Sequence, residues 1–310
     1  MKNTKIVKWL LTMTLALTMV PAYSAQANQA TKEGLKLTDM TGREVVLEEG
    51  PATGIVTLMP SDAEILFELG AGDTIVGRGT YVDYPAEEVE DIPAIATGKD
   101  LNIEEIIALD PQVVIMTGMA LNEDQVKAIE EAGIPVLITD ATTIDGVYEA
   151  IDLLGQVVDR QEEAQELIDE MKATFANFQE KASEQEKPGS IYYEISPLEY
   201  GLWTAGSETF MDEIGSLLGL ENIFADQKSF VEISQEQVLD KNPDYILTTS
   251  MQMDESAPEP QDEIKERQGW EEVTAVKEDH VFAIDNSAFT RPGPRLAQAV
   301  ESLYQLVYGE

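Results

Sequence analysis

The sequence predicts an α/β protein with two similar parallel-sheet lobes, joined by a long rigid helix and separated by a ligand cleft. Short β-branched and aliphatic runs alternate with short helical segments before and after residues 146–184, an alternation typical of parallel α/β sheets. Residues 146–184 carry apolar side chains at helical spacing, which predicts the connection. Residues 102–117 recur without a gap as residues 234–249, which implies two similarly built halves.

Each copy of this repeat predicts a short helix followed by a buried strand. Asn102 and Ser234 each stand three residues before a Glu or Gln, the pattern of a helix N-cap. Pro111 and Pro243 then prevent the helix from continuing, and the aliphatic run that follows is typical of a parallel strand. The copies are too far apart for a solenoid. Two facing lobes predict a ligand site in the cleft between them.

The N-terminal lobe is expected over residues 35–145. A β-hairpin begins it, because two strand-like runs flank Met40-Thr-Gly42. A strand at 54–58 then leads into a helix that Ser61 caps and Gly70 ends. The remaining expected elements are strands at 74–76, 113–116 and 136–138 and helices at 103–109 and 123–132.

Residues 146–184 predict the connecting helical backbone. The segment contains no proline and two glycines, Gly146 and Gly155, which indicates one or two long helices. Too few heptads are present for a coiled-coil arm, so we expect a stiff bridge between the lobes. Its apolar residues at helical spacing are Ile151, Leu154, Val158, Ala164, Leu167, Met171 and Phe175.

The C-terminal lobe is expected over residues 188–310 and repeats the alternation. An acidic loop that contains proline is expected at 252–261. The expected elements are strands at 190–194, 245–247 and 281–284 and helices at 207–218, 236–240 and 294–308.

Residues 1–27 predict a signal peptide. Lys2, Lys5 and Lys8 precede an apolar run over residues 9–20, and small residues follow at 25–27. The apolar run is too short to cross a bilayer, which needs about 20 residues. We therefore expect an exported protein, periplasmic or extracellular. The chain has no Cys, so we expect no anchoring through a lipidated cysteine.

The charge balance of the exported part argues against a nucleic-acid partner. The three lysines of the signal segment leave 17 of the 20 Lys and Arg against 59 Asp and Glu, a net charge of 17 − 59 = −42. Nucleic-acid binding requires basic surfaces. The acids are spread along the chain, so we interpret them as a solvated surface.

The sequence carries no constellation that predicts an enzyme. His280 is the single histidine, so the usual multi-His metal site is excluded, and no Gly-x-Ser-x-Gly motif is present. Carboxylates are so abundant that no acid/base pair stands out. We expect no catalytic residues, no metal site of the protein's own and no cofactor.

Aromatic and arginine side chains are expected in loops at strand ends, where α/β sheets bind ligands. Flat rings there suit a large planar or chelate ligand, although ordinary loop packing is an alternative for each ring. Arg78 and Arg291 hint at an anionic ligand, whereas we expect Arg295 to be structural. The aromatic residues in question are Tyr81, Tyr84, Trp203, Phe230 and Phe289.

Glu104 and Glu236 occupy the same place in the two repeat copies, the first turn of a predicted helix. An acid there stabilises the helix dipole, which is a complete structural explanation. The alternative is that two equivalent carboxylates, one on each lobe, bind basic residues of a partner.

Five motifs distributed in order over the whole mature chain resemble one family, the helical-backbone substrate-binding proteins of ABC importers. These proteins capture ferric siderophores, haem and cobalamin. The motifs are Gly77-Arg-Gly-Thr-Tyr-Val-Asp-Tyr-Pro85, Asn102-Ile-Glu-Glu-Ile-Ile-Ala-Leu-Asp-Pro111, Gly219-Leu-Glu-Asn-Ile-Phe-Ala-Asp226, Ile233-Ser-Gln-Glu-Gln-Val238 and Arg291-Pro-Gly-Pro-Arg295.

The resemblance implies two lobes joined by one long helix, limited hinge motion and a ligand in the cleft. It also implies that Glu104 and Glu236 are the two permease-docking glutamates. In the cobalamin binders, aromatic ligand contacts fall at the positions of Tyr81, Trp203 and Phe230. Thr117 stands where those binders usually carry another large aromatic, which argues against cobalamin.

Haem fits less well, because haem binders of the group often use His or Met as an axial ligand. His280 is the only histidine, although Met59 or a tyrosine could serve.

We therefore expect a non-catalytic receptor that captures a ferric siderophore or related metal chelate and delivers it to a permease dimer. A corrinoid is the alternative ligand within the family, and an exported cleft hydrolase is the rival from another class. We expect a monomer whose partners are the permease and a small-molecule chelate. The expected ligand-binding residues are Pro60, Ser61, Arg78, Tyr81, Trp203, Phe230, Phe289 and Arg291.

Overall fold

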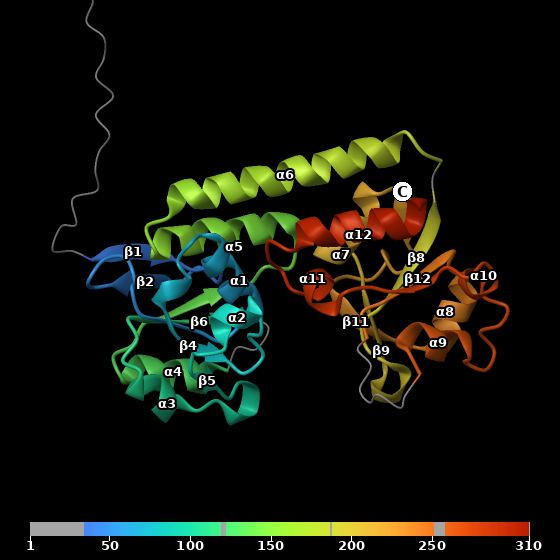
Figure 1. Cartoon of the computed structure of the whole chain (residues 1–310). Helices are drawn as coiled ribbons and strands as arrows, with labels where there is room; N and C mark the ends of the chain where they lie inside the picture. Colours follow the sequence, from blue (N-terminus) through green and yellow to red (C-terminus); the bar gives the residue numbers. More distant parts are fainter. Residues whose placement is uncertain (1–33, 119–121, 187, 251–257, 310) are drawn as a thin grey trace, which may run out of the picture.

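Two parallel β-sheets form the centres of two lobes (Figure 1). The computed structural model describes residues 34–118, 122–186, 188–250 and 258–309. The N-terminal sheet has, in spatial order, β5 (Ala94–Ile95), β4 (Ile75–Gly79), β3 (Ile55–Thr57), β6 (Val113–Thr117) and β7 (Val136–Thr139). The C-terminal sheet has β10 (Leu220–Asn222), β8 (Gly189–Glu194), β12 (Tyr245–Thr248) and β13 (Val281–Ala283).

The two sheets share one topology. Apart from the edge strand β5, the first strand of each lobe (β3 or β8) has the second strand (β4 or β10) on one side. The third and fourth strands follow on the other side, and all neighbours pair in parallel. The strand of the internal repeat, β6 or β12, is therefore third in both sheets. The predicted α/β class and the two similar lobes are confirmed.

The repeated unit also has the same local geometry in both copies. Helix α3 (Ile103–Ala108) begins where Asn102 accepts a hydrogen bond from the Glu105 amide, and α8 (Gln235–Lys241) begins at a capping box formed by Ser234 and Gln237. Each helix is followed by a residue in the left-handed region just before the proline, and these are Asp110 (φ 48°) and Asn242 (φ 45°). The predicted caps and helix–proline–strand order are confirmed.

The start of the first helix differs from the prediction. Helix α1 (Pro60–Glu68) has Met59 as its N-cap with no side-chain cap, and Pro60 occupies its first turn. Proline is favoured there because its missing N–H would have no helical acceptor. Ser61 is therefore a buried residue inside the helix and not its cap. The expected end is close to correct, because Gly70 follows the helix with a φ of +66°.

Two helices occupy the predicted connection. Helix α5 (Ile144–Val157) packs against α1 and the N-terminal strand β1 (Leu35–Thr38). Helix α6 (Gln161–Ser183) runs across both lobes (Figure 1) and packs against α5, α7 (Phe210–Leu217) and α12 (Leu296–Tyr308). The bridge is thus α6, whereas α5 belongs with the N-terminal lobe. The exact domain limits at 35–145, 146–184 and 188–310 remain predictions.

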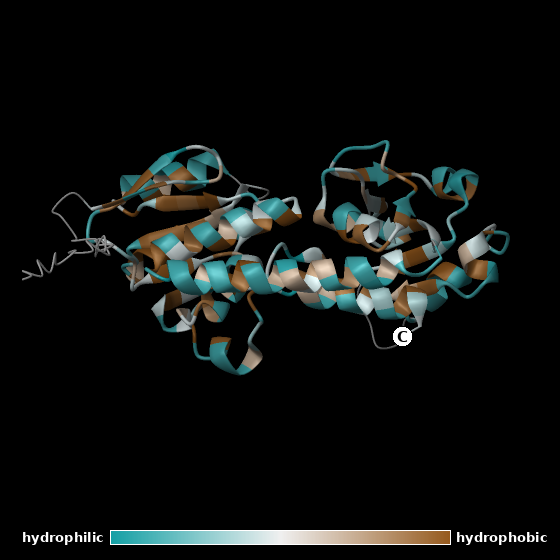
Figure 2. Ribbon diagram, turned by 90° about the horizontal axis from the view of Figure 1, so that it is seen from above, coloured by the Kyte–Doolittle hydropathy of each residue, from teal (hydrophilic) through white to brown (hydrophobic). Residues whose placement is uncertain are grey.

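One continuous apolar core lies beneath α6 and extends into both lobes. It runs from the hairpin residues Leu37 and Val45 through Phe175 and Phe178 of α6 to Tyr304 of α12. Figure 2 shows the hydrophilic outer side of α6 above these elements. Each sheet has a second core on its other face, around Ile106 and Trp270 respectively. The lobes therefore share a core on one side, which limits how freely they can hinge.

The main element that the sequence did not predict is a two-stranded antiparallel ribbon in the C-terminal lobe. Strand β9 (Leu202–Ala205) pairs with β11 (Phe230–Ile233). We expected Trp203 in a loop, but it lies on β9. Both strands are short and lie beyond the ends of the parallel sheet, so no long hydrophobic pattern marks them.

The remaining elements agree with expectation or fall in unassigned segments. The hairpin of β1 and β2 (Glu44–Leu47) is confirmed. Part of the expected acidic loop at 252–261 lies outside the described residues, and a helix begins at Pro260. No helix among the described residues is both long and apolar enough to cross a membrane. The other helices are α2 (Ala86–Val89), α4 (Glu123–Glu131), α9 (Pro260–Lys265), α10 (Thr274–Lys277) and α11 (Asn286–Thr290).

Candidate functional site

A cavity of about 310 Å³ lies against the C-terminal lobe, beyond the carboxyl end of β8, and one of its described lining residues comes from the N-terminal lobe. Ala141, two residues after β7, contributes from the N-terminal lobe. Ile195 and Ser196 follow β8, and Thr290 and Pro292 come from the segment after β13. This is the edge at which α/β sheets bind ligands, so the predicted cleft coincides with a real cavity.

The C-terminal wall of this cavity is apolar and largely aromatic. Trp203 and Phe230 come from the two strands of the ribbon, and Phe210 and Met211 come from the start of α7. The rings of Phe210 and Phe230 meet edge to face, with 6.2 Å between their centroids. Strand alternation turns Trp203 outward with 41% of its surface exposed, whereas Thr204 is fully buried. The structure therefore brings two expected ligand-binding residues, Trp203 and Phe230, together at one cavity.

Exposed aromatic rings concentrate in two segments, one on each lobe. Tyr81 is 71% exposed and Tyr84 37%, and both follow β4. Tyr200 is 65% exposed and, like Trp203, lies in the segment after β8. Large rings are normally buried because exposure forfeits hydrophobic free energy. These four rings are therefore candidates for a surface that a ligand covers.

Pro60 and Ser61 are buried, although both directly follow the first strand as expected. Gly293 of the C-terminal lobe packs over this turn, and a Cβ atom at Gly293 would lie 3.6 Å from the Ser61 carbonyl oxygen. The structure thus places Ser61 at a contact between the lobes and does not open it to the cavity. Met59 and Thr117 instead line a small N-terminal cavity of about 30 Å³.

Arg78 holds the loop that carries Tyr81 and Tyr84. Its Nε donates to the carbonyl oxygen of Val89 at 2.9 Å, and its Nη1 donates to that of Val82 at 2.8 Å. These bonds close residues 78–89 into a compact loop. Arg78 is therefore a positioning residue, and the expected role as a free cation for an anionic ligand does not fit this geometry.

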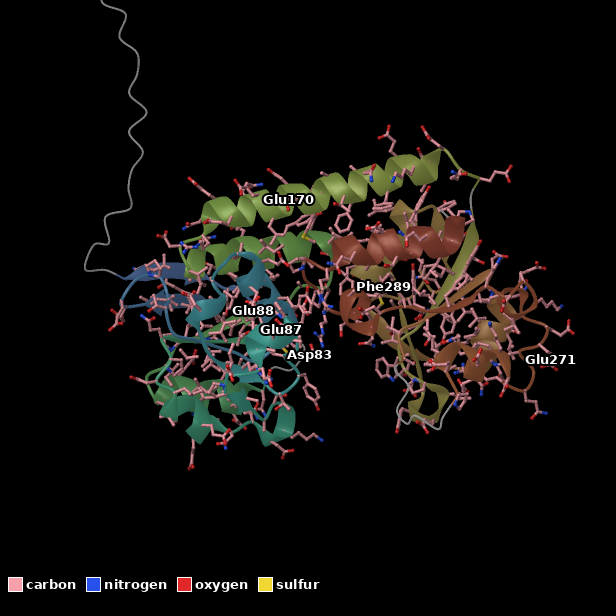
Figure 3. All side chains as sticks on the ribbon, in the orientation of Figure 1. Asp83, Glu87, Glu88, Glu170, Glu271 and Phe289 are labelled. Atoms are coloured by element: carbon pink, nitrogen blue, oxygen red, sulfur yellow. The ribbon has the colours of Figure 1, made fainter. Side chains whose placement is uncertain are left out.

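Arg291 is already bound to two carboxylates of the other lobe. Its Nη1 donates to Asp83 at 2.7 Å and to Glu64 at 3.0 Å, and its Nη2 donates to Asp83 at 3.2 Å. The hydrogen bond from Arg291 lowers the pKa of Asp83. Figure 3 shows Asp83 on the N-terminal lobe at the side that faces the C-terminal lobe. Asp83 and Glu64 therefore already neutralise Arg291, which argues against its expected role in binding an anionic ligand.

Arg295 completes this connection between the lobes. Its Nε and Nη2 bind both oxygens of Glu64, at 2.9 and 2.7 Å, and its guanidinium lies 4.3 Å from the centroid of the Tyr84 ring. Glu64 is only 2% exposed, so both of its oxygens are satisfied by arginines from the opposite lobe. The structural role expected for Arg295 agrees with these contacts.

Phe289 does not reach the cavity surface. It lies in α11, has no exposed surface, and packs against Tyr193 with 6.1 Å between the ring centroids. In Figure 3 it lies beneath α12, inside the C-terminal lobe. We expected it in an open loop, but a short helix buries it because its apolar ring completes the core beneath α12.

Asp62 is a buried acid that was not predicted from the sequence. It is 1% exposed, and its Oδ2 accepts a hydrogen bond from the hydroxyl of Thr139 at 3.1 Å. Burial raises its pKa from 3.8 to about 7, although the bond from Thr139 opposes this shift. Asp62 lies one residue past Ser61, directly behind the turn that faces the other lobe.

Glu104 and Glu236 are both exposed, each in the first turn of its helix. They occupy equivalent places, since α3 and α8 each precede the third strand of a matching sheet. These positions are compatible with both explanations proposed from the sequence. Each carboxylate can stabilise its helix dipole, and the two together can form a symmetric docking pair.

His280 takes part in packing at the edge of the C-terminal sheet. Its ring stacks on Tyr245 with 4.6 Å between the centroids, and its Nδ1 is 3.2 Å from the Asp244 carbonyl oxygen. Within the described ranges, no group of three or more His, Asp or Glu residues could hold a metal ion.

The sequence interpretation did not single out Tyr200, an exposed ring near the ribbon, or Glu64, which binds Arg291 and Arg295. Tyr200 stands only three residues before Trp203, so the same search for aromatics after a strand could have found it. Glu64 has no local signal, because its partners lie more than 200 residues away along the chain.

Comparison with known proteins agrees with this architecture. The chain matches the family of periplasmic binding proteins over residues 55–288. A Bacillus subtilis relative, named an uncharacterized ABC transporter substrate-binding lipoprotein, is 33% identical over 275 residues, which is 87% of this chain and 84% of the relative.

Two solved structures extend the comparison to the fold. A possible iron-binding, periplasmic solute-binding protein from Staphylococcus epidermidis is 28% identical with a TM-score of 0.72, covering 83% of this chain and 99% of that one. The periplasmic vitamin B12 binding protein of Vibrio cholerae is 26% identical with a TM-score of 0.69, covering 83% and 97%. Since the family match spans most of the sequence and both lobes follow the same fold, this chain belongs to the periplasmic binding protein family.

Proposed function

We propose that this chain is the extracytoplasmic substrate-binding protein of an ABC importer, which captures a ferric siderophore or related metal chelate and delivers it to the permease. The observation that carries the proposal is the aromatic cavity against the C-terminal lobe in a member of this family with two matching sheets. Its relatives include an ABC transporter substrate-binding lipoprotein and a possible iron-binding protein, which supports the same role.

Tryptophan fluorescence offers a direct test. Residues 28–310 contain two tryptophans, of which Trp203 is 41% exposed at the cavity and Trp270 is fully buried. Titration with ferric siderophores should quench Trp203 with saturation. In a Trp203→Phe variant the quenching should be mostly lost, while calorimetry still detects binding. A chain that gives neither fluorescence change nor heat with ferric siderophores, cobalamin or haem would contradict the proposal.

A corrinoid is the second candidate. Its support is the 26% identical vitamin B12 binding protein and the aromatic residues Tyr81, Trp203 and Phe230. Thr117 is a small side chain beside the N-terminal cavity, where a large aromatic was expected for this ligand. Saturable binding of cobalamin alone within the same panel would favour this candidate.

The rival interpretation as an exported cleft hydrolase is not retained, because the chain belongs to a family of binding proteins and not of enzymes.

We further propose that Glu104 and Glu236 dock onto the two halves of the permease. Both are exposed and equivalently placed, so one basic site on each permease half could bind one lobe. A Glu104→Ala/Glu236→Ala double variant should lose transport but keep its ligand affinity. The matched control is Glu170→Ala/Glu180→Ala, which removes the same charge from exposed positions of α6 and should transport normally. Unchanged transport in the first variant would refute the docking role.

We propose that the protein is exported and acts as a monomer. The signal peptide expected over residues 1–27 lies outside the described residues. The Bacillus subtilis relative is named a lipoprotein, whereas this chain has no Cys. Cell fractionation would show where the mature protein resides, and light scattering of the mature chain would give its oligomeric state.

A further inference from the structure

The charge of the ligand can be inferred from how the cleft arginines are occupied. Arg291 and Arg295 bind Asp83 and Glu64, and Arg78 binds two backbone carbonyl oxygens. Carboxylates of the protein already neutralise Arg291 and Arg295, so an anionic ligand would compete with Asp83 and Glu64 for these two guanidiniums. Breaking an ion pair that is partly buried leaves a carboxylate without its partner, which is costly.

The surroundings add negative charge. The Asp83 side chain is 63% exposed beside the cleft, and the chain from residue 28 onward carries 17 − 59 = −42. A field of this sign repels an approaching polyanion and attracts a cation. Lys99 is exposed in the turn Gly98–Asp100, next to the small N-terminal cavity. Its single positive charge lies directly beside the negative charge of Asp100 in the sequence.

The exposed rings favour the same ligands, those that are cationic or neutral. Tyr81 on one lobe and Tyr200 and Trp203 on the other leave much of their aromatic surface exposed, whereas the Tyr84 ring already contacts the Arg295 guanidinium. Aromatic faces attract cations through their quadrupole and stack on flat neutral surfaces. Aromatic faces provide no such attraction for a carboxylate or a deprotonated catechol.

We propose that the cleft is selective for electrically neutral or cationic chelates and rejects polyanionic ones, with Tyr200 of the C-terminal lobe as a further ligand-contacting ring. This inference rests on the proposed function and narrows its substrate class. Among iron chelates it favours trihydroxamates, which are neutral or cationic, over tricatecholates, whose ferric complexes carry three negative charges.

A charge-matched panel tests the inference. The full mature chain is titrated at fixed ionic strength with a cationic ferric trihydroxamate, a neutral ferric trihydroxamate, a trianionic ferric tricatecholate and neutral cobalamin. We expect the best neutral or cationic ligand to bind at least tenfold more tightly than the trianion. Salt screens long-range repulsion, but it screens the partly buried pairs of the arginines much less. Part of the difference in affinity should therefore persist at high salt.

Variants separate the sources of the selectivity. Asp83→Asn removes one of the two carboxylates that bind Arg291 and should reduce the affinity ratio between the preferred chelate and the trianion about fivefold. Asp91→Asn removes the same charge from another exposed acid of that lobe and should leave this ratio unchanged. Tyr200→Ala should weaken binding of the preferred chelate about fivefold. Tyr200→Phe, which keeps the ring, should bind this chelate as the parent chain does. Ile107→Ala, which changes an exposed apolar residue on α3, should have no effect.

The outcomes are distinguishable. Tighter binding of the trianion than of any neutral or cationic ligand would overturn the inference and leave the proposed function intact. If that binding were lost in Lys99→Gln, the lone lysine would be the anion site. An unchanged affinity ratio in Asp83→Asn would overturn the role given to the Arg291 pair. Failure of every chelate to bind would remove the proposed function itself, whereas binding of cobalamin alone would keep the charge preference and change the ligand.

Discussion

The buried carboxyl of Asp62 predicts a contribution to stability that is lost as the pH rises from about 4 towards neutrality. Burial raises its pKa from 3.8 to about 7 in the folded protein, whereas in the unfolded chain we expect the ordinary value. Between these two values the folded state holds a proton that the unfolded state has lost. The contribution of Asp62 to stability must therefore decrease as the pH rises from about 4 to about 7 and level off above that.

The size of the effect follows from the shift. An increase from 3.8 to about 7 is roughly 3 pKa units, and each unit corresponds to about 1.36 kcal/mol. The ionised form of Asp62 thus costs about 4 kcal/mol above neutral pH. Asp62→Asn replaces the acid with an amide of similar shape that carries no charge, so it removes this dependence.

The measurement is the difference in unfolding free energy between Asp62→Asn and the parent chain, from urea titrations at several pH values from 4 to 8. The many other acids contribute equally to both proteins and cancel in the difference. The variant should gain about 4 kcal/mol relative to the parent across this range. The control Asp73→Asn, at an exposed acid of the same lobe, should show no such trend. A difference that stays flat from pH 4 to 8 would refute the reasoning.

Two further variants probe the contact between the lobes and the approach to the cleft. Glu64→Gln removes the charge that both Arg291 and Arg295 bind, so it should lower the free energy of unfolding by roughly 3 kcal/mol in urea titrations. A decrease of less than about 1 kcal/mol would mean that the arginines find other partners. Gly79→Ala places a Cβ atom 2.3 Å from a backbone oxygen and should cost at least about 2 kcal/mol. Gly54→Ala, with its nearest neighbour at 3.9 Å, should be tolerated, and equal melting temperatures for the two glycine variants would contradict the steric explanation.

The fold was predictable wherever a local signal exists. The N-caps at Asn102 and Ser234 and the prolines after each repeated helix follow from contacts over a few residues, and they place matching strands in both lobes. The ribbon of β9 and β11 was not predicted, because its partners are about 28 residues apart and each strand is only four residues long. Long-range pairing leaves no periodic pattern in a strand this short.

The sequence placed two of the expected aromatic residues at the cavity, whereas Phe289 is buried and the partners of the arginines were not predicted. Trp203 and Phe230 line the cavity as expected, since a ring after a strand in a parallel sheet tends to lie at the ligand edge. Arg78 and Arg291 suggested an anionic ligand when taken alone. Their partners, the carbonyl oxygens of the 78–89 loop and Asp83 of the other lobe, could be assigned only from the folded chain.

The way the lobes are joined bears on how ligand recognition works. On one side α6 shares a continuous core with both lobes, and on the cleft side Arg291 and Arg295 bind Glu64 and Asp83 across the gap. Lobes held on two sides cannot open widely without breaking buried ion pairs, so the cavity exists largely before the ligand arrives. In a preformed cleft, little binding energy is needed to order the walls. Selectivity then depends on what the walls already present, which in this cavity is the largely apolar surface of Trp203, Phe210, Met211 and Phe230.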